Sequence, residues 1–249
     1  MAGVPFMELV MRRVVISLYD YTTLALNSWA LHGYETHAFD ALHEKEIKNE
    51  QGTYVHPWNA DDHDAIEQVI RHAGERTLIL GWPPCTDLTK VGNAHWKRKF
   101  EADPEFQTKA LNKVLLVKRI AERIGARYMF ENPVGRVSTL YRKPDYLFHP
   151  CYFGGYLPEN DVHPLFPQHF PPRDAYHKYT CIWKSPDFVI PEEDYVCPNF
   201  DTYTSHNGKT YNESLLMTRV GGADLYARIV RSCTPRGFAQ AVYEYNADF

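Results

Sequence analysis

The sequence lacks long apolar runs. None of its hydrophobic stretches approaches the roughly 20 apolar residues that a membrane-spanning helix needs. Residues Met1 to Met11 contain no basic segment ahead of an apolar one, which is the order typical of a secretory signal. We therefore expect a protein that has no membrane partner and stays in the cytoplasm.

Closely spaced cysteine and histidine pairs are also missing. The chain has five cysteines, an odd number at wide intervals, which argues against a disulfide framework. Zinc sites usually draw their ligands from tight Cys and His pairs. The nearest candidates lack that spacing: Cys151, His163, Cys181 and Cys197. From the spacing we predict no metal site.

An excess of positive charge is absent as well. The net charge of -4 argues against a strongly basic nucleic-acid binder, although a local basic groove is still compatible with it. One basic cluster occurs at residues 95–99. There is no internal repeat or low-complexity segment, and 249 residues with 44% hydrophobic content suit one α/β domain spanning 1–249.

The most informative stretch that is present runs from Thr77 to Asp87. Residues 77–80 form a short apolar and β-branched run, typical of a buried strand, which ends at Gly81. Pro83 and Pro84 then force the backbone into a loop. Cys85 therefore lies just past the carboxyl end of a strand, the edge where open α/β sheets bind ligands.

A second stretch mirrors the first. Residues 127–130 are typical of another strand, and Glu131, Asn132 and Pro133 follow at once. If the two strands are neighbours, Cys85 and Glu131 face one crevice. A thiol beside a carboxylic acid suits covalent catalysis with proton transfer.

The amino-terminal part predicts a nucleotide-binding half-unit. A buried strand at 14–19 leads through a turn to a helix at 24–31, which ends before Gly33, and to a second strand at 35–39 closed by Asp40. Backbone N–H groups of such a turn hold a polar or anionic ligand, and the terminal acid accepts hydrogen bonds from ribose hydroxyls.

The two motifs resemble those of the DNA cytosine-5 methyltransferases. Pro83-Pro84-Cys85-Thr86 and Glu131 to Arg136, which reads Glu-Asn-Pro-Val-Gly-Arg, are most similar to short phage-type members. The resemblance implies a Rossmann-like methyltransferase fold with a mostly parallel twisted sheet and a small irregular carboxy-terminal insertion. It also implies S-adenosylmethionine as cofactor, DNA as partner, and the cytoplasm of a bacterium or phage-infected host cell as location.

The resemblance assigns roles to individual residues. Cys85 is expected to add to carbon 6 of a flipped cytosine, Glu131 to protonate ring nitrogen 3, and Asn132 to orient the loop or the acid. Cofactor binding is expected from these residues: Tyr19, Asp20, Tyr21, Thr22, Thr23, Asp40, Asp61 and Pro83. Substrate binding is expected from Pro84, Arg136, Lys178, Lys97 and Arg98.

Two departures from the family pattern, and two residues with more than one interpretation, leave alternatives open. The usual Phe-x-Gly-x-Gly turn is replaced by residues 19–23 without a glycine, which makes the donor uncertain. Lys178 stands alone where most members have an Arg-x-Arg pair. Asp61 is either an adenine ligand or the N-cap of a helix at 64–72, and Asp40 is either a ribose ligand or a solvated strand-end acid.

The carboxy-terminal third is less distinctive. Residues 185–218 offer room only for a reduced target-recognition insertion. Thr234 and Pro235 predict the N-cap and first position of a terminal helix. Two functional alternatives remain beside DNA methylation: a related enzyme that modifies a free cytosine nucleotide such as dCMP or uses another donor, and a non-catalytic DNA-binding relative.

Overall fold

Eight strands form the central sheet of the computed structural model, which describes residues 11–204, 207–214, 220 and 224–249. Their spatial order is β3-β4-β2-β1-β5-β6-β8-β7. The strands are β1 (Arg13–Leu18), β2 (Glu35–Asp40), β3 (Ile47–Lys48), β4 (Tyr54–Pro57), β5 (Arg76–Gly81), β6 (Arg127–Pro133), β7 (Tyr146–Phe148) and β8 (Thr180–Lys184). The central strands β4, β2, β1, β5 and β6 run parallel, whereas β3 and β8 are antiparallel to their neighbours.

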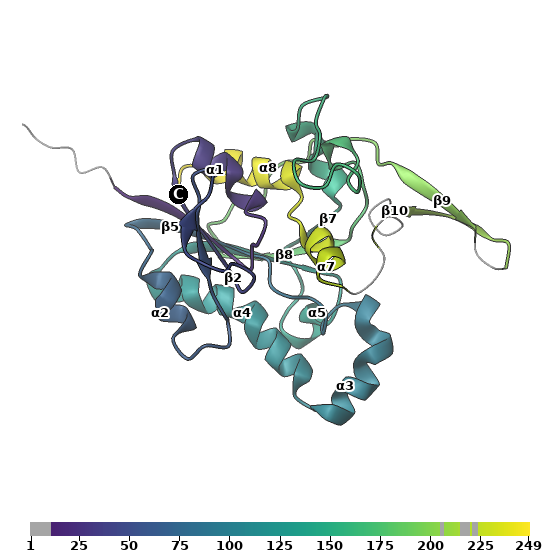
Figure 1. The fold of residues 1–249 in the computed structure, drawn as a ribbon, viewed down its shortest axis with the longest axis horizontal. Helices are drawn as coiled ribbons and strands as arrows, with labels where there is room; N and C mark the ends of the chain where they lie inside the picture. Colours follow the sequence, from purple (N-terminus) through teal and green to yellow (C-terminus); the bar gives the residue numbers. More distant parts are fainter. Residues whose placement is uncertain (1–10, 205–206, 215–219, 221–223) are drawn as a thin grey trace, which may run out of the picture.

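Helices cover both faces of this sheet (Figure 1). The helices α2 (Ala65–Ile70) and α4 (Phe106–Ile124) lie on one face; η1 (Leu24–Leu26), α1 (Asn27–Leu31) and α8 (Arg236–Asn246) lie on the other. Burial on both faces explains why β1 and β5 are almost continuously apolar rather than alternating. The predicted α/β class with a mostly parallel sheet is confirmed, and the arrangement is compatible with a Rossmann-like fold.

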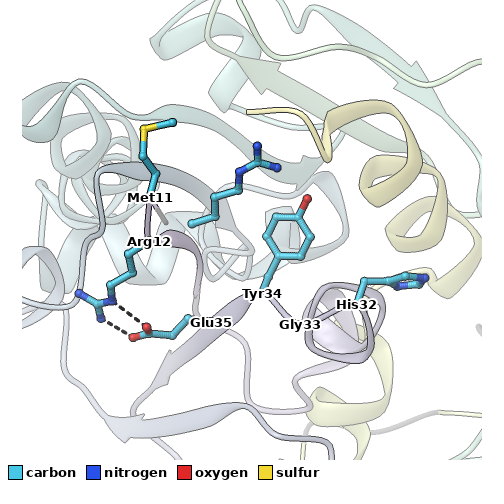
Figure 2. A pocket seen from close by; sticks show the side chains of 7 residues that line it. Met11, Arg12, His32, Gly33, Tyr34 and Glu35 are labelled. Carbon is cyan, nitrogen blue, oxygen red and sulfur yellow. Dashed lines mark hydrogen bonds and ion pairs between the residues drawn. The ribbon is translucent and has the colours of Figure 1, made fainter. Parts of the chain in front are cut away.

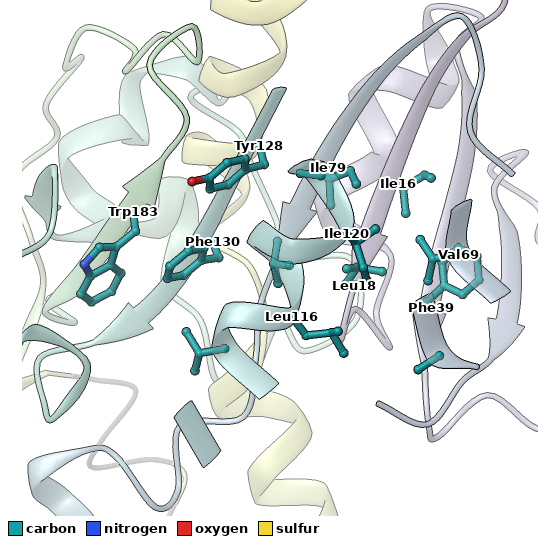
Figure 3. Packing of buried hydrophobic residues seen from close by; sticks show 14 of the residues in the cluster. Ile16, Leu18, Phe39, Val69, Ile79, Leu116, Ile120, Tyr128, Phe130 and Trp183 are labelled. Carbon is teal, nitrogen blue, oxygen red and sulfur yellow. The ribbon is translucent and has the colours of Figure 1, made fainter. Parts of the chain in front are cut away.

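The helix α4 packs along the middle of the sheet (Figure 3). The sequence predicts an apolar face of Leu111, Leu115, Ile120 and Ile124 for this helix. Ile120 is fully buried, and the other three side chains are partly buried against the same core cluster, so this face lies against the sheet. A Cβ atom at Gly81 would lie 2.5 Å from a methyl carbon of Val117, so glycine at the end of β5 lets this helix approach closely.

Several elements differ from the sequence-based expectation. Strand β6 extends to Pro133, so Glu131 and Asn132 lie inside the strand rather than after it. The Pro-rich segment 141–176 contains β7 and the 3-10 helices η3 (Pro150–Tyr156) and η4 (Pro172–Asp174). In the range 185–218 a hairpin of β9 (Phe200–Thr204) and β10 (Thr210–Ser214) extends from the body (Figure 1). Part of that predicted insertion, 205–206 and 215–218, lies outside the described residues.

The terminal helix α8 begins differently from the prediction. It starts at Arg236 with Pro235 as its cap residue, so the assignment of Thr234 as cap was wrong. The backbone N–H groups of Arg236 and Gly237 both donate to the Asp174 carboxylate, at 3.1 Å for Gly237. The Arg236 guanidinium also pairs with Asp174 and, through two bonds of 2.7 and 2.6 Å, with Asp161. A distant acid thus replaces the local cap that sequence reasoning expected.

We expect Asp174→Ala to destabilise the fold strongly. The change removes the cap of α8 and leaves the buried Arg236 with one carboxylate fewer, and breaking a buried ion pair costs about 3–5 kcal/mol. Urea unfolding measures the change in free energy. Glu122→Ala, which removes a surface pair with Lys118, is the control and should cost about 0.5 kcal/mol or less. Equal losses in the two variants would contradict the capping role.

Among the described residues, no helix is both long and apolar enough to span a membrane.

Candidate active site

The sheet has a topological switch point between β1 and β5. The chain proceeds from β1 to β2 and β4 on one side, then returns to β5 and β6 on the other. In open α/β sheets the loops after the two strands at such a point diverge and leave a ligand-binding crevice. The turn at residues 19–23 and the Cys85 loop are the two loops at this position.

The Cys85 loop is fixed from both sides. On the β1 side, Trp82 donates its backbone N–H to Leu18 O and its indole N–H to Ser17 Oγ, each at 3.0 Å. On the β6 side, Asn132 donates its amide Nδ2–H to Pro83 O at 3.1 Å. Asn132 is fully buried, so this bond is shielded from water. Asn132 is therefore a positioning residue for the loop that carries the thiol.

The loop after β6 closes onto the same segment. Thr89 forms a β-bridge with Gly135, and Arg136 donates its backbone N–H to Leu88 O at 2.7 Å. A Cβ atom at Gly135 would lie 2.1 Å from Leu88 O, so only glycine permits this approach. The thiol-bearing loop and the acid-bearing strand are joined by backbone contacts on both sides of Cys85.

Cys85 and Glu131 are close enough to interact electrostatically. Cys85 is partly exposed, and its thiol pKa is raised by burial and by the adjacent Glu131 carboxylate. Glu131 is 8% exposed, and burial raises its pKa as well. Its Oε1 atom is buried without a hydrogen-bond partner. A buried carboxyl with a raised pKa and an unpaired oxygen is suited to exchange a proton with a ligand that lies beside the thiol.

Two cationic side chains act on this pair. Lys178 lowers the pKa of both Cys85 and Glu131, and Arg231 lowers that of Cys85. Lys178 donates to Arg231 O at 3.1 Å, which ties the segment before β8 to α7 (Leu225–Ser232). Lys178, a predicted substrate contact, thus lies near Cys85 and Glu131. Arg231 was missed, because its position in the sequence gave no sign that the end of α7 would approach Lys178.

Arg136 lies at the same edge, at the start of the short helix α5 (Val137–Leu140). Its Nε atom is buried and has no hydrogen-bond partner. This unpaired donor suits an anionic or carbonyl ligand, in line with its predicted contact with substrate. Pro84 is exposed at the surface of the loop, whereas Pro83 is buried beneath it.

The turn after β1 adopts a left-handed backbone without glycine. Tyr19 has a φ angle of 59° and Thr23 a φ angle of 58°. Thr23 occupies the position of the second glycine in the resembling motif, and a β-branched residue with this φ angle is a rare, strained conformation. The turn therefore has a left-handed backbone at Tyr19 and Thr23, and the side chains at these positions narrow the space through which a ligand can reach the backbone.

Asp20 connects this turn to the Cys85 loop. Ser17 donates its hydroxyl to Asp20 Oδ2 at 2.8 Å and accepts from the Trp82 indole, so the three side chains form a buried chain. Thr22 also contacts the Asp20 carboxylate, at 3.4 Å. Burial raises the pKa of Asp20 to about 6. Its proton occupancy therefore changes near neutral pH.

Asp40 lies close to this turn, at the end of β2. Its carboxylate accepts from Leu42 N at 2.8 Å, and burial raises its pKa. His43 follows and its ring contacts that of Tyr21, with centroids 5.5 Å apart. The His43 Nε2 atom is buried and unpaired. The ends of β1 and β2 thus bring together the Asp40 carboxyl, the Tyr21 ring and the unpaired Nε2 atom of His43.

Asp61 and Tyr19 lie toward α4 instead. Asp61 is exposed and pairs with Lys113 at 2.6 Å, at a small cavity of about 160 Å³. Tyr19 donates its hydroxyl to Lys113 O at 2.9 Å and its ring packs on Trp58. The N-cap residue of α2 is Asp64, so the interpretation of Asp61 as the cap was wrong.

Two of the predicted basic contacts, Lys97 and Arg98, lie on a helix that follows the thiol loop in the chain. Lys97 and Arg98 are exposed on α3 (Trp96–Ala102), which projects from the body beside α4 (Figure 1). Lys99 of the same helix pairs with Asp87, two residues after Cys85. The basic cluster is therefore anchored to the thiol loop through Lys99, which was not among the predicted contacts.

Another cavity lies at the opposite edge of the sheet, at the amino ends of the strands. It measures about 570 Å³ and is lined near the amino ends of β1 and β2 by Arg12, Tyr34 and Glu35 (Figure 2). The Arg12 guanidinium pairs there with the Glu35 carboxylate. No residue of the predicted site lines this cavity. Parallel sheets bind ligands at their carboxyl edge, so we assign the site to the Cys85 crevice.

Comparisons with protein-family models and with curated proteins do not identify a family for this chain. No protein-family model matches the chain. A search of curated proteins likewise finds no match.

Proposed function

We propose that the protein is an S-adenosylmethionine-dependent DNA cytosine-5 methyltransferase. The observation that carries the proposal is the placement of Cys85 and Glu131 at one edge of the sheet, on the loop after β5 and on the neighbouring parallel strand β6. There the Glu131 carboxylate raises the pKa of the Cys85 thiol. The motif that supplies the thiol and the motif that supplies the acid come from different strands. Asn132 joins them through its bond to Pro83.

The residues at the ends of β1 and β2 fit the cofactor. The buried and unpaired Nε2 atom of His43, beside the Tyr21 ring and the Asp40 carboxyl, suits a ligand that carries hydroxyl groups and a flat base. Asp20 and the left-handed turn would face its methionine part. When bound, S-adenosylmethionine supplies the electrophilic methyl group.

The chain's own residues account for the activation of cytosine. The Cys85 thiolate forms a bond to carbon 6, and Glu131 holds a proton at ring nitrogen 3, which lowers the cost of that addition. Carbon 5 would then have enamine character and take the methyl group from S-adenosylmethionine, with S-adenosylhomocysteine as the leaving group. Water would take the proton from carbon 5, the Cys85 sulfur would leave carbon 6 as thiolate, and the proton on ring nitrogen 3 would return to Glu131, which restores the aromatic ring. Lys178 and Arg231 stabilise the thiolate before the addition.

A transfer assay tests the proposal. Purified protein is incubated with methyl-labelled S-adenosylmethionine and, in parallel, with duplex DNA, single-stranded DNA or dCMP. We expect label at carbon 5 of cytosine in DNA, located by digestion to nucleosides and mass spectrometry. Absence of label from every substrate would contradict methyl transfer and favour a non-catalytic DNA-binding relative.

A free cytosine nucleotide is the second candidate substrate. Among the described residues of 185–218, the regular structure is a two-stranded hairpin of β9 and β10. A hairpin of this size offers little surface for contacts with DNA bases. The net charge of -4 also favours a small substrate over a polyanion. Label on dCMP and none on DNA would establish this alternative.

A further inference from the structure

Three histidines far apart in the sequence meet between β2, β4 and the end of α2. His37 lies on β2, His56 on β4, and His72 just after α2. One ring nitrogen from each lies within 4.8 Å of the others. His37 and His56 are 3% and 5% exposed, whereas His72 is partly exposed and borders solvent. None of the three belongs to the candidate active site.

The outer nitrogens of the two buried rings bind carboxylates. His37 Nε2 lies 2.7 Å from Glu35 Oε1, and His56 Nδ1 lies 3.0 Å from Glu46 Oε1. Glu35 is held in turn by Arg12. A carboxylate on the far nitrogen of a histidine is the usual outer partner of a metal-binding imidazole, because it fixes the ring and increases its basicity.

The inner nitrogens of these rings face each other. His37 Nδ1 and His56 Nε2 are 2.9 Å apart. If each ring donates its single N–H to its carboxylate, both inner nitrogens present lone pairs across this gap. Two lone pairs at this distance repel each other, and a cation bound between the two nitrogens removes that repulsion. Two nitrogen ligands of tetrahedral zinc are about 3.3 Å apart, so only a small movement opens the gap to bonding distance.

We propose that His37, His56 and His72 bind one divalent transition-metal ion, zinc in the first place. His37 coordinates through Nδ1 and His56 through Nε2, and the solvent side next to His72 leaves a fourth position for water. Three imidazoles favour zinc, copper or nickel over magnesium or calcium. The ion joins β2, β4 and the end of α2, so its role is to stabilise this edge of the sheet.

The earlier expectation of no metal site came from sequence spacing. That rule looks for closely spaced ligand pairs, whereas these three ligands are brought together by the parallel pairing of β2 with β4 and by the packing of α2 above them. His37 and Phe39 are two residues apart on β2 and therefore point to the same face of the sheet. The Phe39 ring stacks on His56 with ring centroids 4.5 Å apart. The apolar ring shields the cluster from the core side.

Metal binding to the full chain, freed of metal with a chelator, tests this proposal. We expect one Zn²⁺ per chain by calorimetric titration, and the visible absorption of tetrahedral Co²⁺ when cobalt replaces zinc. His72→Gln should weaken zinc binding by about 100-fold. Added zinc should raise the thermal unfolding midpoint of this variant less than it raises the midpoint of wild type. His63→Gln is the matched control, because that side chain is 98% exposed near the same helix.

Two results would overturn the proposal. Wild-type chain that binds no zinc at equimolar concentration, with a proton between the two buried rings detected by NMR, would assign the cluster to a hydrogen-bonded pair. Equal zinc affinity of wild type and His72→Gln would place the bound metal elsewhere. Since His72 lies at the surface, loss of binding with unchanged circular dichroism is attributable to the lost ligand. The cobalt spectrum of wild type tests the site without any substitution.

Discussion

Cys85→Ala is expected to lose methyl transfer by about 10³-fold or more, because no other described thiol can replace the nucleophile. The thiol pKa is raised, so the residue depends on Lys178 and Arg231 to form thiolate, and alanine removes the reacting atom while leaving the loop bonds of Trp82 and Asn132 in place. The folded state should therefore persist in the variant.

A covalent trap provides the direct measurement for this prediction. DNA containing 5-fluorocytosine retains the enzyme, since fluorine at carbon 5 blocks the final proton loss. With S-adenosylmethionine present, wild type should give a slower band on a denaturing gel, whereas Cys85→Ala should give none. Cys197→Ala is the matched control, because Cys197 is exposed and lies outside the crevice. An adduct that survives in Cys85→Ala would exclude Cys85 as the nucleophile.

Glu131→Gln is expected to lower turnover by about 10²- to 10⁴-fold, the usual contribution of a positioned acid. Glutamine keeps the shape of the side chain, but it cannot hold a carboxyl proton at ring nitrogen 3. Single-turnover transfer rates measure the loss. Glu159→Gln, an exposed acid on the surface, should keep the wild-type rate. A Glu131→Gln variant with unchanged turnover would show that proton donation comes from another group.

The same substitution should raise stability at alkaline pH. Burial raises the folded-state pKa of Glu131 above its ordinary value of 4.5. The folded state therefore holds this proton more tightly than the unfolded chain, and the stability from that proton is lost as pH rises from about 4.5 through the raised pKa. A glutamine side chain does not titrate, so the Glu131→Gln variant does not lose this stability as the pH rises. Thermal unfolding should show Glu131→Gln above wild type at pH 8 and equal to it near pH 4; a reversed order would contradict a buried neutral acid.

Much of the candidate site could be predicted from local sequence. Apolar runs that end in proline or acid located β1, β2, β5 and β6, and parallel pairing of such strands brings their carboxyl ends together. This is why Cys85 and Glu131, far apart in the chain, were expected in one crevice. Gly33, with a φ angle of 82°, also has the left-handed conformation that its place after a helix predicted.

Other parts depended on contacts that no local pattern encodes. The cap of α8 comes from Asp174, and the link from Asp20 to the thiol loop passes through Ser17 and Trp82. Sequence rules for caps look at the neighbouring residue, so they chose Thr234. Similarly, the distance of α4 from the sheet depends on Gly81, where a side chain would collide with Val117.

The sequence by itself determined the strands of the amino-terminal half-unit and the two chemical groups that follow or end the later strands, because hydrophobic periodicity and proline geometry act over a few residues. Tertiary structure alone decided which side chains surround those groups: the pairing of Lys178 with α7, the exposed position of Asp61, and the meeting of His37, His56 and His72. Those contacts join segments distant in the chain, and their distances follow from sheet register and helix packing rather than from spacing in the sequence.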